Sequence, residues 1–298
     1  MKDTLGDRIM MLFIYSFLIL LAVSTLYPFL NALAVSFNQG LDTSKGGVTL
    51  WPRVFTLENY KVVFKDDRLM SGFFISVLRT IIGTASAILC TAIFSYGMSK
   101  KELMGRKYYM VMCIITMYFG GGLIPTFMLI RNLGLMNSFW VFIIPSLIGV
   151  WNMIIFRTFF QGLPNGLEES AKIDGCGNWG TLFRIVLPLS GPVIATLALF
   201  TAVYHWNEWF LAGIYISDQN KYPIQTILRQ ILLSNIVSEQ GGGGLDASSL
   251  AHMQRAKTIT SKSLSMATMI VATLPIICVY PFVQKYFVKG VLVGSLKE

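Results

Sequence analysis

The stretch "GLEESAKIDGCGNWGTLFRIVLPLSGP", residues 166–192, is a polar segment inside a strongly apolar chain. It carries three acidic and two basic residues, and long apolar runs lie on both sides of it. Helix-forming residues and two early glutamates predict a short helix over 167–173, because the helix dipole favours acids in the first turn. Asp174 and Gly175 predict where this helix ends, since glycine accepts the left-handed conformation of a C-terminal cap.

A second helix is predicted from Trp179 to Val186, and Leu187-Pro188 predicts a bend into the next apolar run. The result would be a small helix-turn-helix that stands out from the membrane. One face of the first helix is small and apolar, formed by Leu167 and Ala171 with Ser170 beside them. Such a face fits a groove on another protein. The alternative is an amphipathic helix resting on lipid, which usually carries more Lys and Arg and larger apolar residues.

The regions outside this segment predict an all-α membrane protein. Apolar residues make up 54% of the chain and charged residues only 13%. Six runs with at most one Asp, Glu, Lys or Arg each reach the roughly 20 residues that a helix needs to cross the hydrocarbon core. Backbone groups in lipid must be paired, and these runs are too long for barrel strands of about 10 residues. We expect one transmembrane domain over 1–298, with spans near 9–36, 71–99, 107–130, 137–161, 187–216 and 263–283.

The first span has a possible alternative as a secretion signal, because Ala32-Leu33-Ala34 resembles a cleavage site. The apolar run before it, residues 9–30, is longer than the roughly 7 to 15 residues of a signal core. We therefore expect this span to be retained.

The basic residues of the short loops predict the orientation. The turn at 99–109 carries four Lys and Arg, whereas the turn after the third span has only Arg131. This places the 99–109 turn, the 164–188 loop and both termini in the cytoplasm. Segments 37–70 and 218–262 would then face outward, and "GGGGLDASS" at 241–249 reads as a flexible loop tip.

Several other kinds of site are disfavoured. The net charge of +9 is scattered over the loops rather than gathered with aromatics, so a nucleic-acid partner is not expected. The four cysteines lie far apart, and the two histidines, His205 and His252, have no ligand spacing, so no metal site is expected. No Gly-Lys dipeptide occurs, which rules out a phosphate-binding P-loop in this chain.

The spacing of the polar segment is similar to the EAA signature of permeases of binding-protein-dependent ABC importers. Glu169-Ser170-Ala171 is followed after three residues by Gly175, and after nine more by Ile185, one residue and Leu187-Pro188. The departure is Ser170 in place of the family's middle alanine. Further stretches along the chain, among them 74–84, 117–140, 204–210, 221–232 and 271–298, resemble the LplC-type branch of the maltose-permease-like carbohydrate importers.

This resemblance implies a six-helix permease of the bacterial cytoplasmic membrane that is not itself an enzyme. It implies a second homologous permease, two cytoplasmic ATPase subunits that bind ATP and Mg, and an extracytoplasmic binding protein that delivers a carbohydrate. The 164–188 loop would be the coupling helix that docks on the ATPase. The residues expected to couple are Glu168, Glu169, Ser170, Ala171, Asp174 and Gly175.

Ionisable groups inside a span usually face a cavity or a partner, so Glu208 and Arg79 are candidate functional residues. On a continuous helix, His205, Glu208 and Trp209 would share a face, with Tyr204 and Asn207 beside it. Aromatic faces with amide and carboxyl groups suit a sugar, and these five residues are the predicted substrate path. The tryptophans could instead belong to an interfacial belt. Arg79 could equally be a structural partner of an acid or a carbonyl.

Gly120-Gly121-Gly122 and Pro125 predict a broken or flexible turn in the third span, or close helix packing. Two other function classes compete with the importer subunit. A secondary transporter should show inverted repeats and a buried ionic relay. A membrane-embedded enzyme needs a catalytic constellation, and neither histidine has one within its span. A permease for a solute other than a sugar also stays open.

Overall fold

The computed structural model describes residues 5–240 and 260–295 of the chain. Throughout these two ranges the regular secondary structure is helical, and the strand-like pairing there is an isolated bridge between Asn38 and Phe55. The predicted all-α class is confirmed. The glycine-rich stretch 241–249 and His252 lie outside the described residues.

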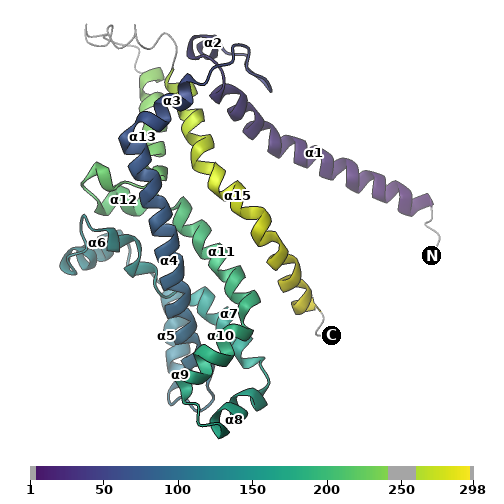
Figure 1. Cartoon of the computed structure of the whole chain (residues 1–298), viewed down its shortest axis with the longest axis vertical. Helices are drawn as coiled ribbons and strands as arrows, with labels where there is room; N and C mark the ends of the chain where they lie inside the picture. The colour runs from purple at the N-terminus through teal and green to yellow at the C-terminus, as the bar shows by residue number, and fades with distance from the viewer. Residues whose placement is uncertain (1–4, 241–259, 296–298) are drawn as a thin grey trace. The chain divides into compact units, whose positions relative to one another are not determined.

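The helices follow one another along the chain as in Figure 1. The first group is α1 (Leu5–Ser36), α2 (Gly40–Ser44), α3 (Glu58–Lys65), α4 (Asp67–Ser99), α5 (Arg106–Tyr118) and α6 (Leu123–Asn132). Then come 3-10 turns Phe139–Phe142 and Ile144–Ser146, α7 (Val150–Gln161), α8 (Asn165–Ile173) and α9 (Asn178–Thr181). A π-helical turn Leu182–Val186 leads into α10 (Leu187–Leu189), α11 (Gly191–Asn207) and α12 (Phe210–Tyr215). The last group is a 3-10 turn Gln219–Lys221, α13 (Ile224–Gln240) and α15 (Ser261–Ser295).

Three helices of the described part are each long and apolar enough to cross a membrane: Gly6–Ser36, Asp67–Ser99 and Ser261–Val279. Three further candidates are bent pairs: α5 with α6 at 114°, Phe139–Ser146 with α7 at 47°, and Asn178–Leu189 with α11 at 82°. The six predicted spans are matched if each bent pair crosses once. The predicted break in the third span is confirmed, because α5 ends before the glycines and α6 begins after Gly122, which has φ of +83°.

The described residues form two compact units, one made of residues 5–70 with 228–240 and 260–274, and the other of residues 71–227 with 275–295. In the first unit a buried asparagine joins three segments. The Asn59 amide donates to the carbonyls of Ser36 (2.8 Å) and Asn38 (3.0 Å). Its oxygen accepts from the Ser263 hydroxyl (3.0 Å). Because buried polar groups need partners, this network fixes the end of α1, α3 and the start of α15 together (Figure 1).

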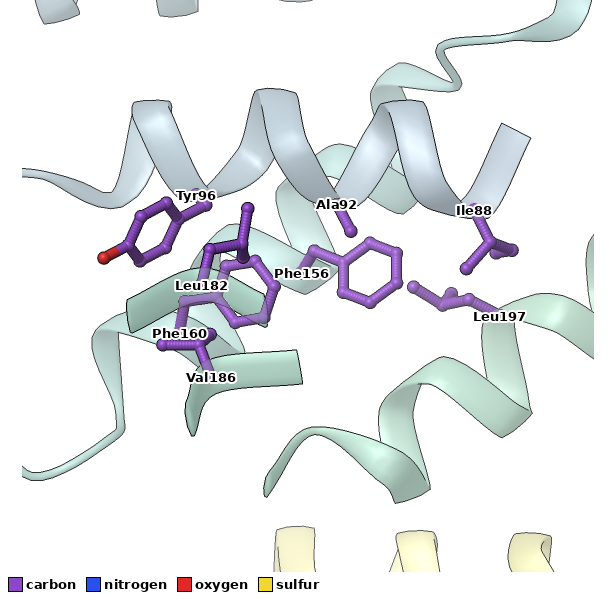
Figure 2. Close-up of a cluster of buried hydrophobic side chains, with 8 residues drawn as sticks. All are labelled: Ile88, Ala92, Tyr96, Phe156, Phe160, Leu182, Val186 and Leu197. Atoms are coloured by element: carbon purple, nitrogen blue, oxygen red, sulfur yellow. The ribbon is translucent and has the colours of Figure 1, made fainter. Parts of the chain in front are cut away.

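The core of the second unit lies between α4, α7, the π-helical turn and α11. Figure 2 shows side chains of these elements meeting along one face of α4, where Ile88, Ala92 and Tyr96 recur every four residues. Phe156 is fully buried opposite Ala92, and Phe160 packs edge-on to Tyr96 at 6.3 Å between ring centroids. Within lipid, such contacts stabilise helix pairs by close packing rather than by removal from water. Because α7 and the π-helical turn flank α8 in the chain, this packing fixes the elements on both sides of α8.

A second cluster in the same unit joins α6, the 3-10 turn at 139–142 and α12. Its buried members are Ile130, Val141, Phe142, Ile143, Ala212, Tyr215 and Ile216. The Asn137 amide donates to the Tyr215 carbonyl (2.8 Å), which ties the loop after α6 to the end of α12. The region from the end of α6 to Ile143 is therefore packed against α12.

Candidate functional site

The polar segment forms the short helix that its sequence predicts. Gly175, just after α8, has φ of +77°, a conformation that L side chains rarely adopt. Its amide donates to the Lys172 carbonyl (3.1 Å). The next amide, of Cys176, donates to the Ala171 carbonyl (2.8 Å). These are the two hydrogen bonds of a Schellman cap, which satisfy carbonyls that a helix end otherwise leaves unpaired.

Replacing Gly175 with valine is expected to disrupt this cap by about 1–2 kcal/mol, because left-handed backbone is strained for a residue with a Cβ. A Cβ at Gly175 meets no atom within 4 Å, so the cost is conformational and not a clash. We expect weaker stimulation of the partner ATPase, measured as ATP turnover of the assembled transporter. Gly177→Val is the matched control, since Gly177 has φ of −74° and equal space around it. Equal losses in both variants would contradict the cap as the cause.

The bend into the next apolar helix differs from the prediction. The structure continues helically through Leu187-Pro188 and bends by 82° at Ser190, between Leu189 and Gly191. Pro188 follows directly on the π-helical turn Leu182–Val186 and does not interrupt the helix. Pro192 forces the break instead, because a proline ring clashes with the carbonyl four residues earlier. The second helix begins at Asn178, one residue before the predicted Trp179.

The predicted coupling residues do not share one environment. Glu169, Ser170, Asp174 and Gly175 are exposed. Ala171 is buried, with 3% of its surface exposed, so this side chain packs against its own chain. The expectation that Ala171 belongs to an outward face is therefore wrong for this structure, because helical spacing defines a face but does not show whether the rest of the chain covers it.

Three exposed apolar side chains of this segment were missed from the sequence. Ile173 is 85% exposed, Trp179 64% and Phe183 46%. The rings of Trp179 and Phe183 stack at 6.1 Å between centroids. Their spacing of four residues was a usable signal, because such residues meet on one helix face.

Glu168 is engaged within the chain. Its carboxylate forms an ion pair with the ammonium of Lys100, the residue that follows α4. The same ammonium lies 4.1 Å from the centroid of the Tyr96 ring. Burial lowers the pKa of Lys100, but its contacts with Glu168 and Tyr96 raise that pKa more, so the net shift is upward. Lys100 therefore stays charged across the physiological pH range.

The predicted path residues lie where an apolar helix breaks. α11 ends at Asn207, Glu208 is extended with ψ of 121°, and α12 begins at Phe210. The assumption that His205, Glu208 and Trp209 share one helix face is thus wrong, because no helix continues past Asn207. The sequence stretch 204–210 contains no proline or glycine that would have marked the break.

Arg79 of α4 binds the backbone and side-chain groups at this break. Its guanidinium donates to the carbonyls of His205 and Glu208, the latter at 2.6 Å. It also pairs with the Glu208 carboxylate at 3.4 Å. The other oxygen of that carboxylate accepts from the Leu211 amide (2.9 Å) at the start of α12. One buried arginine and one glutamate thereby satisfy backbone groups that would be unpaired in lipid. Of the two roles left open for Arg79, the geometry favours the structural one.

His205 is also part of the scaffold. Its side chain is 1% exposed and packs against α4 at Gly83. A Cβ at Gly83 would lie 2.7 Å from the imidazole, so the contact requires glycine there. Tyr204, Asn207 and Trp209, by contrast, have exposed side chains.

Of these three residues, Tyr204 lines a cavity of about 280 Å³ within the second unit. It is lined by Ala87, Ser146, Ile148, Gly149, Asn152, Phe200, Thr201 and Tyr204, and none of these eight residues is charged. Asn152 donates to the Thr201 hydroxyl (3.2 Å), which donates in turn to the Leu197 carbonyl (2.8 Å). Phe200 and Tyr204 lie four residues apart on α11 and are about half exposed, 49% and 53%. The cavity therefore combines amide and hydroxyl groups with aromatic faces.

The described helices are long and apolar enough for up to six membrane spans, and α8 and α9 form a structured polar loop. No group of three or more His, Cys, Asp or Glu suited to a metal occurs in ranges 5–240 and 260–295. Residues 6–293 match the family described as binding-protein-dependent transport system inner membrane component. The chain belongs to this family. It is a permease subunit, a non-catalytic inner membrane component of such a transport system.

Several known proteins are similar to this chain over nearly its whole length. The polygalacturonan/rhamnogalacturonan transport system permease protein YtcP of Bacillus subtilis is 41% identical over 297 residues, covering 100% of both chains. Protein LplC of the same organism is 41% identical over 274 residues, covering 92% of this chain and 90% of that protein. The arabinooligosaccharides transport system permease protein AraQ of Halalkalibacterium halodurans is 27% identical, with coverage of 95% and 94%.

A solved structure shares the fold. It is a chain of a bacterial ABC transporter involved in the import of the acidic polysaccharide alginate, with a TM-score of 0.87 and 25% identity. The match covers 96% of this chain and 99% of that chain. The predicted family and permease fold are thereby confirmed.

Proposed function

We propose that this chain forms half of the translocation path of an ATP-driven importer, and that its cargo is a carbohydrate, supplied as an oligosaccharide. The observation that carries the carbohydrate assignment is the uncharged cavity between α7 and α11. A sugar offers hydroxyls to Asn152 and Thr201 and C–H faces to the rings of Phe200 and Tyr204. The names of two relatives, which specify polygalacturonan/rhamnogalacturonan and arabinooligosaccharides, support the same class.

Of the five residues predicted to line the substrate path, we retain three as candidates for contact with the cargo. Tyr204 and Asn207 lie three residues apart on α11 and are exposed, so they can face the cargo together with Trp209. His205 and Glu208 hold the helix break and contribute to the path only by placing these neighbours.

The proposed assembly has a second homologous permease, two ATPase subunits that bind ATP and Mg, and an extracytoplasmic binding protein. Both termini and α8 face the cytoplasm of a bacterial cell, and segments 37–70 and 218–262 face the binding protein. The exposed Glu169, Ile173 and Trp179 of the polar loop give the ATPase a mixed charged and apolar surface to bind. This chain itself binds no nucleotide.

A secondary transporter is the main competing function. It would need an intramembrane acid that is free to bind and release a cation or a proton. Glu208, the acid of the fifth predicted span, is occupied by Arg79 and by the Leu211 amide. The burial of this ion pair therefore favours the importer subunit.

The test is reconstitution in proteoliposomes with and without partners. The chain alone should neither hydrolyse ATP nor accumulate sugar. With its partner permease, ATPases and binding protein, it should show ATP turnover that tetragalacturonate or arabinotetraose stimulates. Uptake by the chain alone under a proton or sodium gradient would support the secondary transporter. Stimulation by amino acids or peptides but by no sugar would show that the chain belongs to an importer whose cargo is not a carbohydrate.

A further inference from the structure

The end of α4 is held by side chains from α7. The last carbonyls of a helix have no partner within it. Here the Arg157 guanidinium donates to the Met98 carbonyl (3.2 Å), and the Gln161 amide donates to the Ser99 carbonyl (3.3 Å). Arg157 and Gln161 are one turn apart on α7, so one helix face caps the end of the other. With the packing of Phe160 against Tyr96, these hydrogen bonds join the ends of α4 and α7.

Lys100 connects the joined ends of α4 and α7 to α8. It is the first residue after α4, and its ammonium lies between the Tyr96 ring of α4 and the Glu168 carboxylate in the first turn of α8. The Lys100 and Glu168 side chains are only 24% and 30% exposed, so solvent screens the pair less than a fully exposed one. The neighbouring Lys101 and Glu169 are both exposed. Adjacent residues of the same charge thus face different surroundings.

We propose that Lys100 is a positioning residue that fixes α8 to the ends of α4 and α7 through Glu168, so that movement of α8 is passed to these membrane helices without slippage. Glu169 is left for the partner, whereas Glu168 acts inside the chain. This division rests on the proposed function of the loop as the contact to an ATPase. Without this ion pair, α8 would be joined to the membrane helices only through the backbone on either side of it. It could then tilt when the ATPase subunits close, and less of its movement would reach α4 and α7.

The experiment uses the complete reconstituted transporter and measures three quantities: basal ATP turnover, turnover stimulated by tetragalacturonate or arabinotetraose, and sugar transported per ATP. Lys100→Glu should lower stimulated turnover and sugar per ATP roughly 3- to 10-fold, because it removes an ion pair and a cation–π contact and adds repulsion. The charge-swapped double variant, Lys100→Glu with Glu168→Lys, should recover part of both losses, since the ion pair is restored with opposite sign but the cation–π contact with Tyr96 is not. Lys101→Glu is the matched control and should behave as the parent.

A role limited to folding would lower assembly, basal turnover and transport together, so sugar per ATP separates the two. If Lys100→Glu assembles poorly, sugar transported per ATP is measured instead in Lys100→Gln, which removes the charge without adding repulsion. Unchanged sugar per ATP in the assembled single variants, no recovery in the swap, or equal effects at Lys101 would overturn the proposal. A parent transporter that no sugar stimulates would instead overturn the carbohydrate assignment, and a parent chain that assembles with no ATPase would overturn the role of the loop on which this inference rests.

Discussion

Replacing Arg79 with leucine is expected to destabilise the assembled permease by about 3–5 kcal/mol, the usual cost of breaking a buried ion pair. The substitution leaves Glu208 charged and buried, and it removes the donor of the His205 and Glu208 carbonyls. Neither lipid nor the adjoining residues of α11 can replace these hydrogen bonds. The expected result is low yield and a much lower midpoint of thermal unfolding for the detergent-solubilised complex.

The control for Arg79→Leu is Arg131→Leu, because Arg131 is exposed in the last turn of α6. The double variant Arg79→Leu with Glu208→Leu should recover part of the lost stability, since it no longer buries an unpaired charge. An Arg79→Leu complex with parental thermal stability and lost transport would show that Arg79 contacts the cargo instead.

The sequence was most informative where local chemistry decides the structure. A left-handed residue after a short helix is a local requirement, and the glycine at 175 revealed both the end of α8 and its cap. The length and polarity of the runs likewise predicted the three long apolar helices Gly6–Ser36, Asp67–Ser99 and Ser261–Val279, and three consecutive glycines predicted the break between α5 and α6. None of these features depends on a distant residue.

Features that depend on distant residues were predicted less well. At the break at Glu208, Arg79, 129 positions earlier in the chain, donates to the carbonyls of His205 and Glu208. A helical projection assumes that the helix continues, so it placed Glu208 and Trp209 on a face that does not exist. Similarly, charge patterns could not distinguish Lys100 from Lys101, or Glu168 from Glu169. Only the packing of α4, α7 and α8 separates these pairs.

The cavity shows the same limit. Asn152 lies inside an apolar run and would be read from the sequence as one polar residue of a span. Its relation to Thr201 becomes visible only when α7 and α11 are brought together. The stretch "YHWNEWF" at 204–210 correctly drew attention to the end of α11. Tyr204, however, lines the cavity, whereas His205 and Glu208 hold the fold.

Replacing Asn152 with leucine is expected to lower sugar-stimulated ATP turnover and uptake roughly 5- to 150-fold, because sugar hydroxyls left unpaired in a closed path cost about 1–3 kcal/mol. Assembly should survive. The Thr201 hydroxyl keeps its bond to the Leu197 carbonyl, and Asn152 belongs neither to the helix break nor to the polar loop. Asn132→Leu is the matched control, since Asn132 is an exposed residue at the end of α6.

The uncharged lining gives this prediction a second, sharper form. With no cation among the cavity's eight lining residues, Asn152 and Tyr204 can bind hydroxyls and ring faces but cannot neutralise a carboxylate. The loss caused by Asn152→Leu, taken as the ratio to the parent on the same probe, should therefore be similar for tetragalacturonate and for arabinotetraose. Taking this ratio cancels any preference of the binding protein. Gly149→Ala, which adds a methyl group 3.6 Å from the Asn152 amide nitrogen, should reduce transport of both probes by filling the same space. A loss confined to the acidic probe would mean that the cavity binds charge, and parental transport in both variants would place the sugar elsewhere.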